Sequence, residues 1–161
     1  ETLPPNLQTI GEEAFSNTKL KKVILPDTVT SIGERAFYCC ETLKTVSIGK
    51  GAVTVGEEAF RGCPALDDLT ISESAENRTL EDHAFGGCKS LSAVVIPNKV
   101  TVKDNVFLNC TGLRSITLGK DTVVEGKYGT AGFPDNIEVH FTGTLAYCSP
   151  WPTISASSRA I

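Results

Sequence analysis

Six cysteines are the residues of this chain with the most evident capacity for chemistry. Four of them stand three residues after a phenylalanine in a repeated pattern: Cys40, Cys63, Cys88 and Cys110. A zinc site is disfavoured because its ligands must converge on one point, whereas a repeated position places them in a row. A buried thiol behaves as a small apolar side chain, so we predict four free core thiols. The expected spacing of stacked cysteines would also permit disulfides. Cys39 and Cys148 lie outside the row and are candidates for exposed, reactive thiols.

Histidines and carboxylates offer no catalytic arrangement. Acyl transfer needs a nucleophile, a base and an orienting group within hydrogen-bond reach, but the two histidines, His83 and His140, are expected on opposite faces of the fold. Paired carboxylates such as Glu57 and Glu58 recur at equivalent repeat positions, which indicates an architectural role. Motifs for phosphate loops, dinucleotides, zinc proteases and EF-hands are missing from the sequence. We therefore predict a protein that is not an enzyme, with no cofactor and no metal site.

A sequence repeat must position all these side chains. Six phenylalanines mark it, at spacings of 22, 23, 25, 22 and 26 residues: Phe15, Phe37, Phe60, Phe85, Phe107 and Phe133. Six residues after four of these rings, a leucine opens a short apolar alternation such as LKTVSI from Leu43. Segments with this period of two are typical of half-buried strands. They predict strands at residues 20–25, 43–48, 66–71, 91–96, 113–118 and 137–141.

Each repeat has a second short apolar segment before its phenylalanine, for example residues 29–32 and 53–55. An acidic residue such as Glu12 or Glu34 follows, where negative charge would favour the start of a helical turn. One strand per repeat cannot pair with itself, so the repeats must stack with their strands about 4.8 Å apart in a parallel sheet. The predicted architecture is a strand-rich α/β solenoid, with one parallel β-sheet on one face and short strands and helical turns on the other.

The string LxxIxIPxxVxxIGxxAFxxC resembles the BspA-like, or Treponema pallidum type, class of leucine-rich repeats. The best copy runs from Val23 to Cys40, and the match is clearest over residues 20–118. The fourth repeat departs from it by a two-residue insertion within SESAENR. The resemblance implies a leucine-rich repeat solenoid. Members of this class are often surface proteins that bind host or matrix proteins, so it also implies an extracellular or cell-surface interaction module. The cytoplasm stays open as the alternative location.

Composition narrows the class of partner to proteins. The chain of 161 residues has 15 Lys and Arg against 19 Asp and Glu, which gives a formal net charge of −4. This balance disfavours a nucleic-acid partner, because phosphate binding needs clustered positive charge. No apolar run approaches the roughly 20 residues that cross a bilayer, so we expect no membrane insertion in this segment.

The predicted strands present two outward rows as the candidate partner-binding surface. One row comprises Lys22, Thr45, Asp68, Ala93, Ser115 and Glu138, and the other comprises Ile24, Ser47, Thr70, Val95, Thr117 and His140. The surface lacks the aromatic and arginine anchors that dominate interface energy. It offers roughly 400–500 Å², below the roughly 800 Å² per partner of a standard interface. We therefore expect weak contacts multiplied along an array. The alternative is a structural spacer or a subunit of a larger assembly.

We predict a single solenoid of about six units over residues 1–141. Leu3 precedes Phe15 by 12 residues, as Leu25 precedes Phe37, so the chain starts at the end of a strand. We therefore expect the solenoid to continue N-terminally in a longer chain. Residues 142–161 lose the repeat and are predicted to form a C-terminal cap or a flexible tail.

Overall fold

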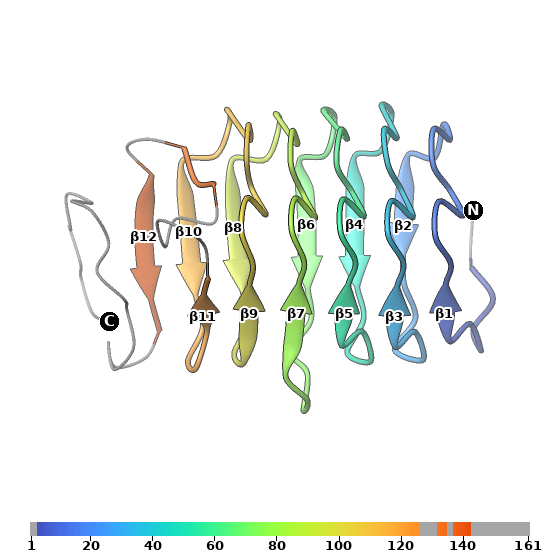
Figure 1. Cartoon of the computed structure of the whole chain (residues 1–161), viewed down its shortest axis with the longest axis horizontal. Helices are drawn as coiled ribbons and strands as arrows, with labels where there is room; N and C mark the ends of the chain where they lie inside the picture. Colours follow the sequence, from blue (N-terminus) through green and yellow to red (C-terminus); the bar gives the residue numbers. More distant parts are fainter. Residues whose placement is uncertain (1–2, 126–131, 135–136, 143–161) are drawn as a thin grey trace.

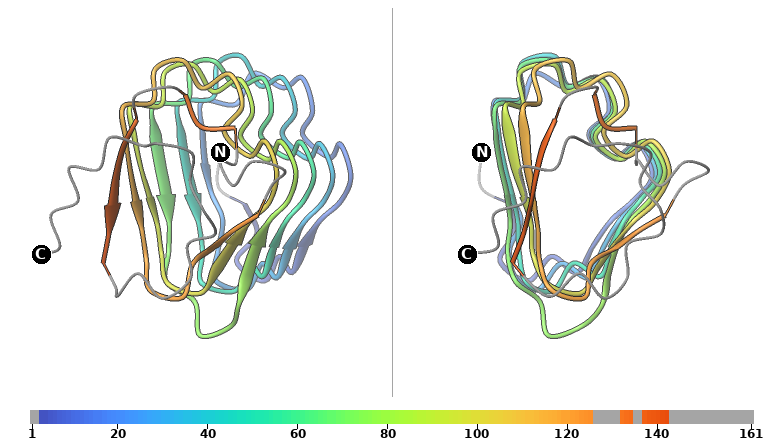
Figure 2. Two further views of the ribbon diagram at one scale, coloured as in Figure 1. Left: turned by 60° about the vertical axis from the view of Figure 1, so that its left-hand side comes forward. Right: turned by 90° about the vertical axis from the view of Figure 1, so that its left-hand side faces the viewer.

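The computed structural model describes residues 3–125, 132–134 and 137–142, which form a solenoid of stacked coils (Figure 1). Each coil consists of a first strand, a turn region that contains the repeated phenylalanine, and a second strand. Coils two to five comprise residues 26–48, 49–71, 72–96 and 97–118. Seen along the solenoid axis, the first and second strands lie on opposite sides of each coil, and the turn region joins them at one end (Figure 2).

The first strands of the coils build one continuous parallel sheet in the order β1-β3-β5-β7-β9-β11. These strands are short: β1 (Thr9–Ile10), β3 (Ser31–Ile32), β5 (Thr54–Val55), β7 (Arg78–Leu80), β9 (Val100–Val102) and β11 (Val123–Val124). The second strands form what we call the strand face: β2 (Lys22–Ile24), β4 (Thr45–Ile48), β6 (Asp68–Ile71), β8 (Ala93–Ile96), β10 (Ser115–Leu118) and β12 (Glu138–Phe141). Each lies inside a strand range predicted from the leucine spacing, so the solenoid fold and its register are confirmed.

The space between the sheet of first strands and the strand face is filled by ladders of identical or similar side chains. Along β4, Val46 and Ile48 are fully buried while Thr45 and Ser47 are partly exposed, as the period of two predicts. The phenylalanines of coils two to five are all fully buried. Successive rings from Phe15 to Phe133 stack with centroids 4.9–5.8 Å apart. This stack runs along the axis and joins every described coil to the next.

The predicted helical turns are wrong: in the described part of the chain, the segment around each phenylalanine is a series of turns and no helix is assigned. Glu13 and Asn17 have φ values of 52° and 58°, and a right-handed helix does not accommodate such left-handed residues. Phe15 donates its N–H to the carbonyl of Ala36 in the next coil at 2.7 Å, in place of a bond within its own coil. The turn region is therefore held by hydrogen bonds between coils, and its acidic residues cap no helix.

The strand face is divided in two, which corrects the prediction of one sheet on this side. Strands β2-β4-β6 form one half and β8-β10-β12 the other, whereas β6 and β8 are neighbours without ladder pairing. The N–H of Ser72, just after β6, donates to the carbonyl of Ile48 at the end of β4 at 3.0 Å. Likewise, the N–H of Gly119, just after β10, donates to the carbonyl of Ile96 at the end of β8 at 2.8 Å. The equivalent residue after β8 is Pro97, which has no N–H to donate.

A buried arginine lies in the insertion of the fourth coil, next to this division. Arg78 is 1% exposed, and its guanidinium donates to three backbone carbonyls: those of Gly49 and Ala52 in coil three and that of Ser72. Burial lowers the pKa of the Arg78 side chain from its ordinary value. The arginine therefore joins coils three and four, whose strands β6 and β8 are not paired on the strand face.

Candidate functional site

The strand face places both predicted outward rows at the surface and in register. In the first half, Lys22 pairs with Thr45 and Thr45 with Asp68, while Ile24, Ser47 and Thr70 form the parallel row. The second half repeats this arrangement as two rows: Ala93, Ser115 and Glu138; and Val95, Thr117 and His140. The position of each row is confirmed, and its role in binding stays a prediction.

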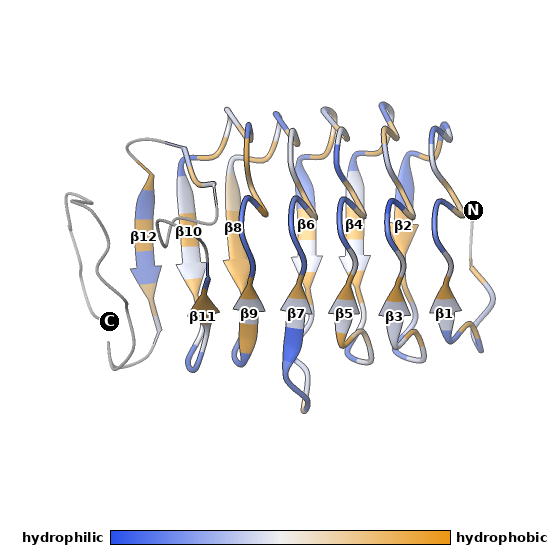
Figure 3. Ribbon diagram, viewed as in Figure 1, coloured by the Kyte–Doolittle hydropathy of each residue, from blue (hydrophilic) through white to orange (hydrophobic). Residues whose placement is uncertain are grey.

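The character of this surface changes along the solenoid axis. Val95 is 62% exposed and Ile24 48% exposed, so each half has one prominent apolar side chain. Figure 3 shows hydrophobic colour along the whole of β8, where every residue is apolar. At the far end, the His140 imidazole lies 3.7 Å from the Glu138 carboxylate. The strand face therefore has an apolar strand, β8, on one side of the division and the exposed Asp68 of β6 on the other, with a basic residue on β2 and an acidic one on β12.

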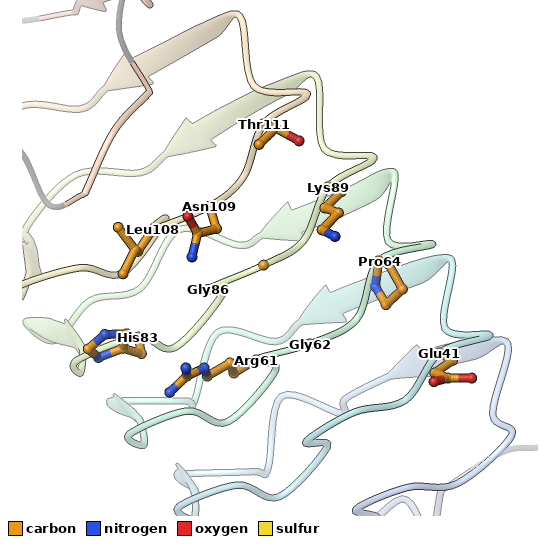
Figure 4. Close-up of a pocket in the computed structure, with 11 residues that line it drawn as sticks. Glu41, Arg61, Gly62, Pro64, His83, Gly86, Lys89, Leu108, Asn109 and Thr111 are labelled. Carbon is orange, nitrogen blue, oxygen red and sulfur yellow. The ribbon is translucent and has the colours of Figure 1, made fainter.

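A concave feature, which we call the turn groove, lies on the turn regions of coils two to five. It encloses about 520 Å³, within the size range of ligand sites. Gly62, Gly86 and Gly87 contribute to its lining, together with charged and polar side chains at its rim: Glu41, Arg61, His83, Lys89, Asn109 and Thr111. In Figure 4, Gly86 lies between His83 and Arg61 on one side and Lys89 on the other. The strand-face rows do not contribute to it.

One rim residue of the groove is fixed by an ion-pair cluster. Glu58, whose side chain is 9% exposed, binds the guanidinium groups of both Arg61 and Arg35, the latter at 2.6 Å. Burial acts to raise the pKa of Glu58, but the hydrogen bonds from Arg35 and Arg61 outweigh it and lower that pKa. Glu58 was predicted to be architectural, and its contacts agree with that interpretation. It also orients Arg61 at the edge of the groove.

The two histidines lie apart, as predicted from their repeat positions: His83 borders the turn groove and His140 is on β12. Over residues 3–125, 132–134 and 137–142, no three histidine, cysteine or acidic side chains gather as a ligand set for a metal ion. The same residues include no helix with the length and apolarity needed to cross a bilayer.

Sequence reasoning missed the turn groove. A signal existed: the residue after each repeated phenylalanine is Ser16, Tyr38, Arg61, Gly86 or Leu108. The fourth repeat alone among these has no side chain there, and the gap lies between larger neighbours. This signal is a missing side chain, and it indicates a groove only when the stacking of neighbouring coils is known.

The four cysteines of the repeat are buried as predicted, and the structure has them as free thiols. Each thiol donates to the carbonyl of a phenylalanine in the previous coil; the Cys63 thiol, for example, lies 3.3 Å from the oxygen of Phe37. The pKa of Cys63 is raised by its hydrogen-bonding contact with Cys40 and by burial. Contact with Cys110 and burial raise the pKa of Cys88 in the same way. Cys63 and Cys88 therefore stay protonated. The same contacts lower the pKa of Cys40 and of Cys110, but both side chains are fully buried, so reagents do not reach them.

We expect the native protein to react with maleimide at Cys39, which is partly exposed, and to leave the four ladder thiols unmodified. After denaturation without reductant, at least four more thiols should react. Mass spectrometry of peptides from both samples measures each site. Recovery of bridged peptides that join successive ladder positions would contradict the prediction.

The matches to known proteins agree with this geometry. The family model described as "BspA type Leucine rich repeat region" matches residues 8–128 in six copies. A leucine-rich cell surface protein of Faecalibacterium prausnitzii is 28% identical, with a TM-score of 0.66, over 99% of this chain and 47% of that one. The leucine-rich repeat protein of T. pallidum is 22% identical, with a TM-score of 0.63, over 83% of this chain and 77% of that one. The pneumococcal vaccine antigen PcpA is 16% identical, with a TM-score of 0.60, over 77% of this chain and 36% of that one.

A search of the curated proteins gave no match to the sequence. This chain spans about half the length of the Faecalibacterium structure, and the likeness to the T. pallidum and pneumococcal proteins concerns the fold. The family model covers most of the chain, residues 8–128. The chain therefore belongs to the BspA-type leucine-rich repeat family.

Proposed function

We propose that this chain is a non-catalytic module that binds another protein through its strand face, at the cell surface or outside the cell. The observation that supports it most is the register of two outward rows, which repeat small polar side chains around the exposed Ile24 and Val95. Such a surface suits weak contacts that add up along an array. The surface location rests on the likeness to the leucine-rich cell surface protein of F. prausnitzii.

The double variant Thr70→Arg with Thr117→Arg tests the strand face. Both positions lie on one row, one in each half, and both side chains point outward. Two bulky charges there should obstruct an approaching protein, so we expect binding to fall by about tenfold or more. Biolayer interferometry against a panel of immobilised extracellular-matrix proteins measures the loss, and thermal unfolding checks that stability is kept.

The matched control is Glu12→Lys, an exposed charge change on the turn region. It should leave binding intact. If Glu12→Lys impairs binding and the strand-face variant does not, the contact lies on the turns. A chain that binds nothing in the panel and copurifies with a fixed complex would favour the spacer or assembly-subunit function instead.

A further inference from the structure

We propose that the turn groove binds the carboxylate of an acidic peptide segment from a partner protein, as a second contact separate from the strand face. The groove has three features that point to such an occupant: a glycine in its lining, an arginine fixed by an ion pair that keeps further N–H donors, and two basic side chains for which the described part of the chain shows no partner.

The glycine is Gly86. A Cβ atom built on this residue would lie 3.3 Å from the carbonyl oxygen of His83 and 3.6 Å from Cγ of Arg61. Neither contact is a severe clash, and the φ angle of Gly86 is not in the left-handed range. A side chain here would need the His83 carbonyl to shift by a few tenths of an ångström, and the Leu108 position of the next coil carries one. Because Gly86 has no side chain, the lining of the groove is lower at this point than between the larger neighbours Arg61 and Leu108.

The end of the groove that holds Arg61, His83 and Lys89 favours an anion. Glu58 holds Arg61 in place, and the guanidinium keeps further N–H donors that can bind a carboxylate. Among the described residues, the structure records no hydrogen-bond or ion-pair partner for the Lys89 ammonium or the His83 imidazole. These basic groups gather on a chain whose formal net charge is −4. An orientation fixed before binding lowers the entropic cost of holding a ligand.

The dimensions favour a peptide. The groove crosses four coils, which at about 4.8 Å per coil corresponds to about 14 Å, or four to five residues of extended chain. Glu41 lies at one end of the groove, about two coil spacings from the centre of the basic cluster. About three residues of an extended peptide span this distance. The occupant is therefore an extended segment with an acidic residue over Gly86 and a basic residue about three positions away, beside Glu41. Pro64 and Leu108 provide apolar contact for the residues between them.

The test uses two blocked hexapeptides, Ac-Gly-Lys-Ala-Ala-Glu-Gly-NH2 and Ac-Gly-Glu-Ala-Ala-Lys-Gly-NH2, which present this charge spacing in both directions. Each is titrated into the ¹⁵N-labelled chain and followed by two-dimensional NMR. The amides of Gly62, Gly86 and Gly87 report on the groove, because glycine signals are well separated from the others. We expect saturable shifts at these amides with one of the two peptides. The same peptide with glutamine in place of its glutamate should cause no shift.

Three variants separate groove binding from a general charge effect. Gly86→Leu adds a side chain at the low point of the lining, and Lys89→Glu reverses one rim charge; each should weaken peptide binding by about tenfold or more, the effect of losing one charge-assisted contact. Arg61→Gln should do the same. Its matched control is Arg35→Gln, which removes the other guanidinium bound to Glu58 but lies outside the groove; it should change affinity by less than about threefold.

The proposal is overturned if no glycine amide shifts at about 2 mM peptide, if the glutamine analogue binds equally well, or if Gly86→Leu leaves binding unchanged. Binding of a sulfated heparin disaccharide with no binding of either peptide would also overturn it and would indicate an anionic carbohydrate site. Thr70→Arg with Thr117→Arg should leave peptide binding unchanged. The outcome for the groove is thus independent of the outcome for the strand face.

Discussion

Replacing Phe60 by alanine is expected to lower the free energy of unfolding by about 3–5 kcal/mol. The ring is fully buried and stacks between Phe37 at 4.9 Å and Phe85 at 5.2 Å. Its removal would leave a cavity that the rigid backbone ladders on either side cannot close. Urea denaturation followed by circular dichroism measures the loss.

Phe15→Ala is the matched control, because the same ring in the first coil is only partly buried and has one stacked neighbour. We expect a cost of less than about half that of Phe60→Ala, since the cost of truncation increases with the cavity that remains. Equal costs at the two positions would mean that the stack does not carry the stability attributed to it.

The second large effect is expected at Arg78. Replacing it with methionine keeps much of the side-chain volume but leaves three carbonyls, those of Gly49, Ala52 and Ser72, without their donors. Hydrogen bonds from charged groups contribute about 1.5–3 kcal/mol each, and burying a cation costs several kcal/mol in return. We therefore expect a net loss of about 2–4 kcal/mol in the free energy of unfolding.

Arg114→Met provides the comparison, because Arg114 is exposed and donates to carbonyls within its own turn. Its effect should stay within about 0.5 kcal/mol. Hydrogen exchange adds a spatial readout: in Arg78→Met, the amides of β7 should lose more protection than those of β3. If both arginine variants unfold at the same denaturant concentration as the parent chain, Arg78 does not join the two coils energetically.

The sequence predicted the strands well because each depends on a local pattern. An alternation such as that of residues 43–48 can be recognised without knowing what lies beside it, and equal spacing then aligns one strand with the next. The same reasoning failed at the turns. Glu13 and Arg35 adopt left-handed φ angles although neither is a glycine, the residue type that would indicate such a conformation in the sequence. Their conformation is set by hydrogen bonds to the neighbouring coil.

Arg78 and the turn groove were beyond sequence reasoning for a related reason. A charged residue in an insertion is normally solvated, and nothing in SESAENR indicates that its last residue meets three carbonyls. The groove depends on residues of four coils, from Glu41 to Thr111. Local patterns therefore predict the stacked framework, whereas sites that exist only between coils require the structure.

The division between β6 and β8 has a mechanical consequence. Hydrogen bonds between parallel strands lie across the strands, so here they run along the solenoid axis. A pulling force along that axis loads the interfaces between coils in series, like springs joined end to end. The interface of coils three and four lacks one of its two ladders. The load there falls on the β5–β7 pairing, the hydrogen bonds between the turn regions, the ring stack and the guanidinium of Arg78. Under tension, the array should part first at this interface, and each separated portion would keep three strands of the strand face.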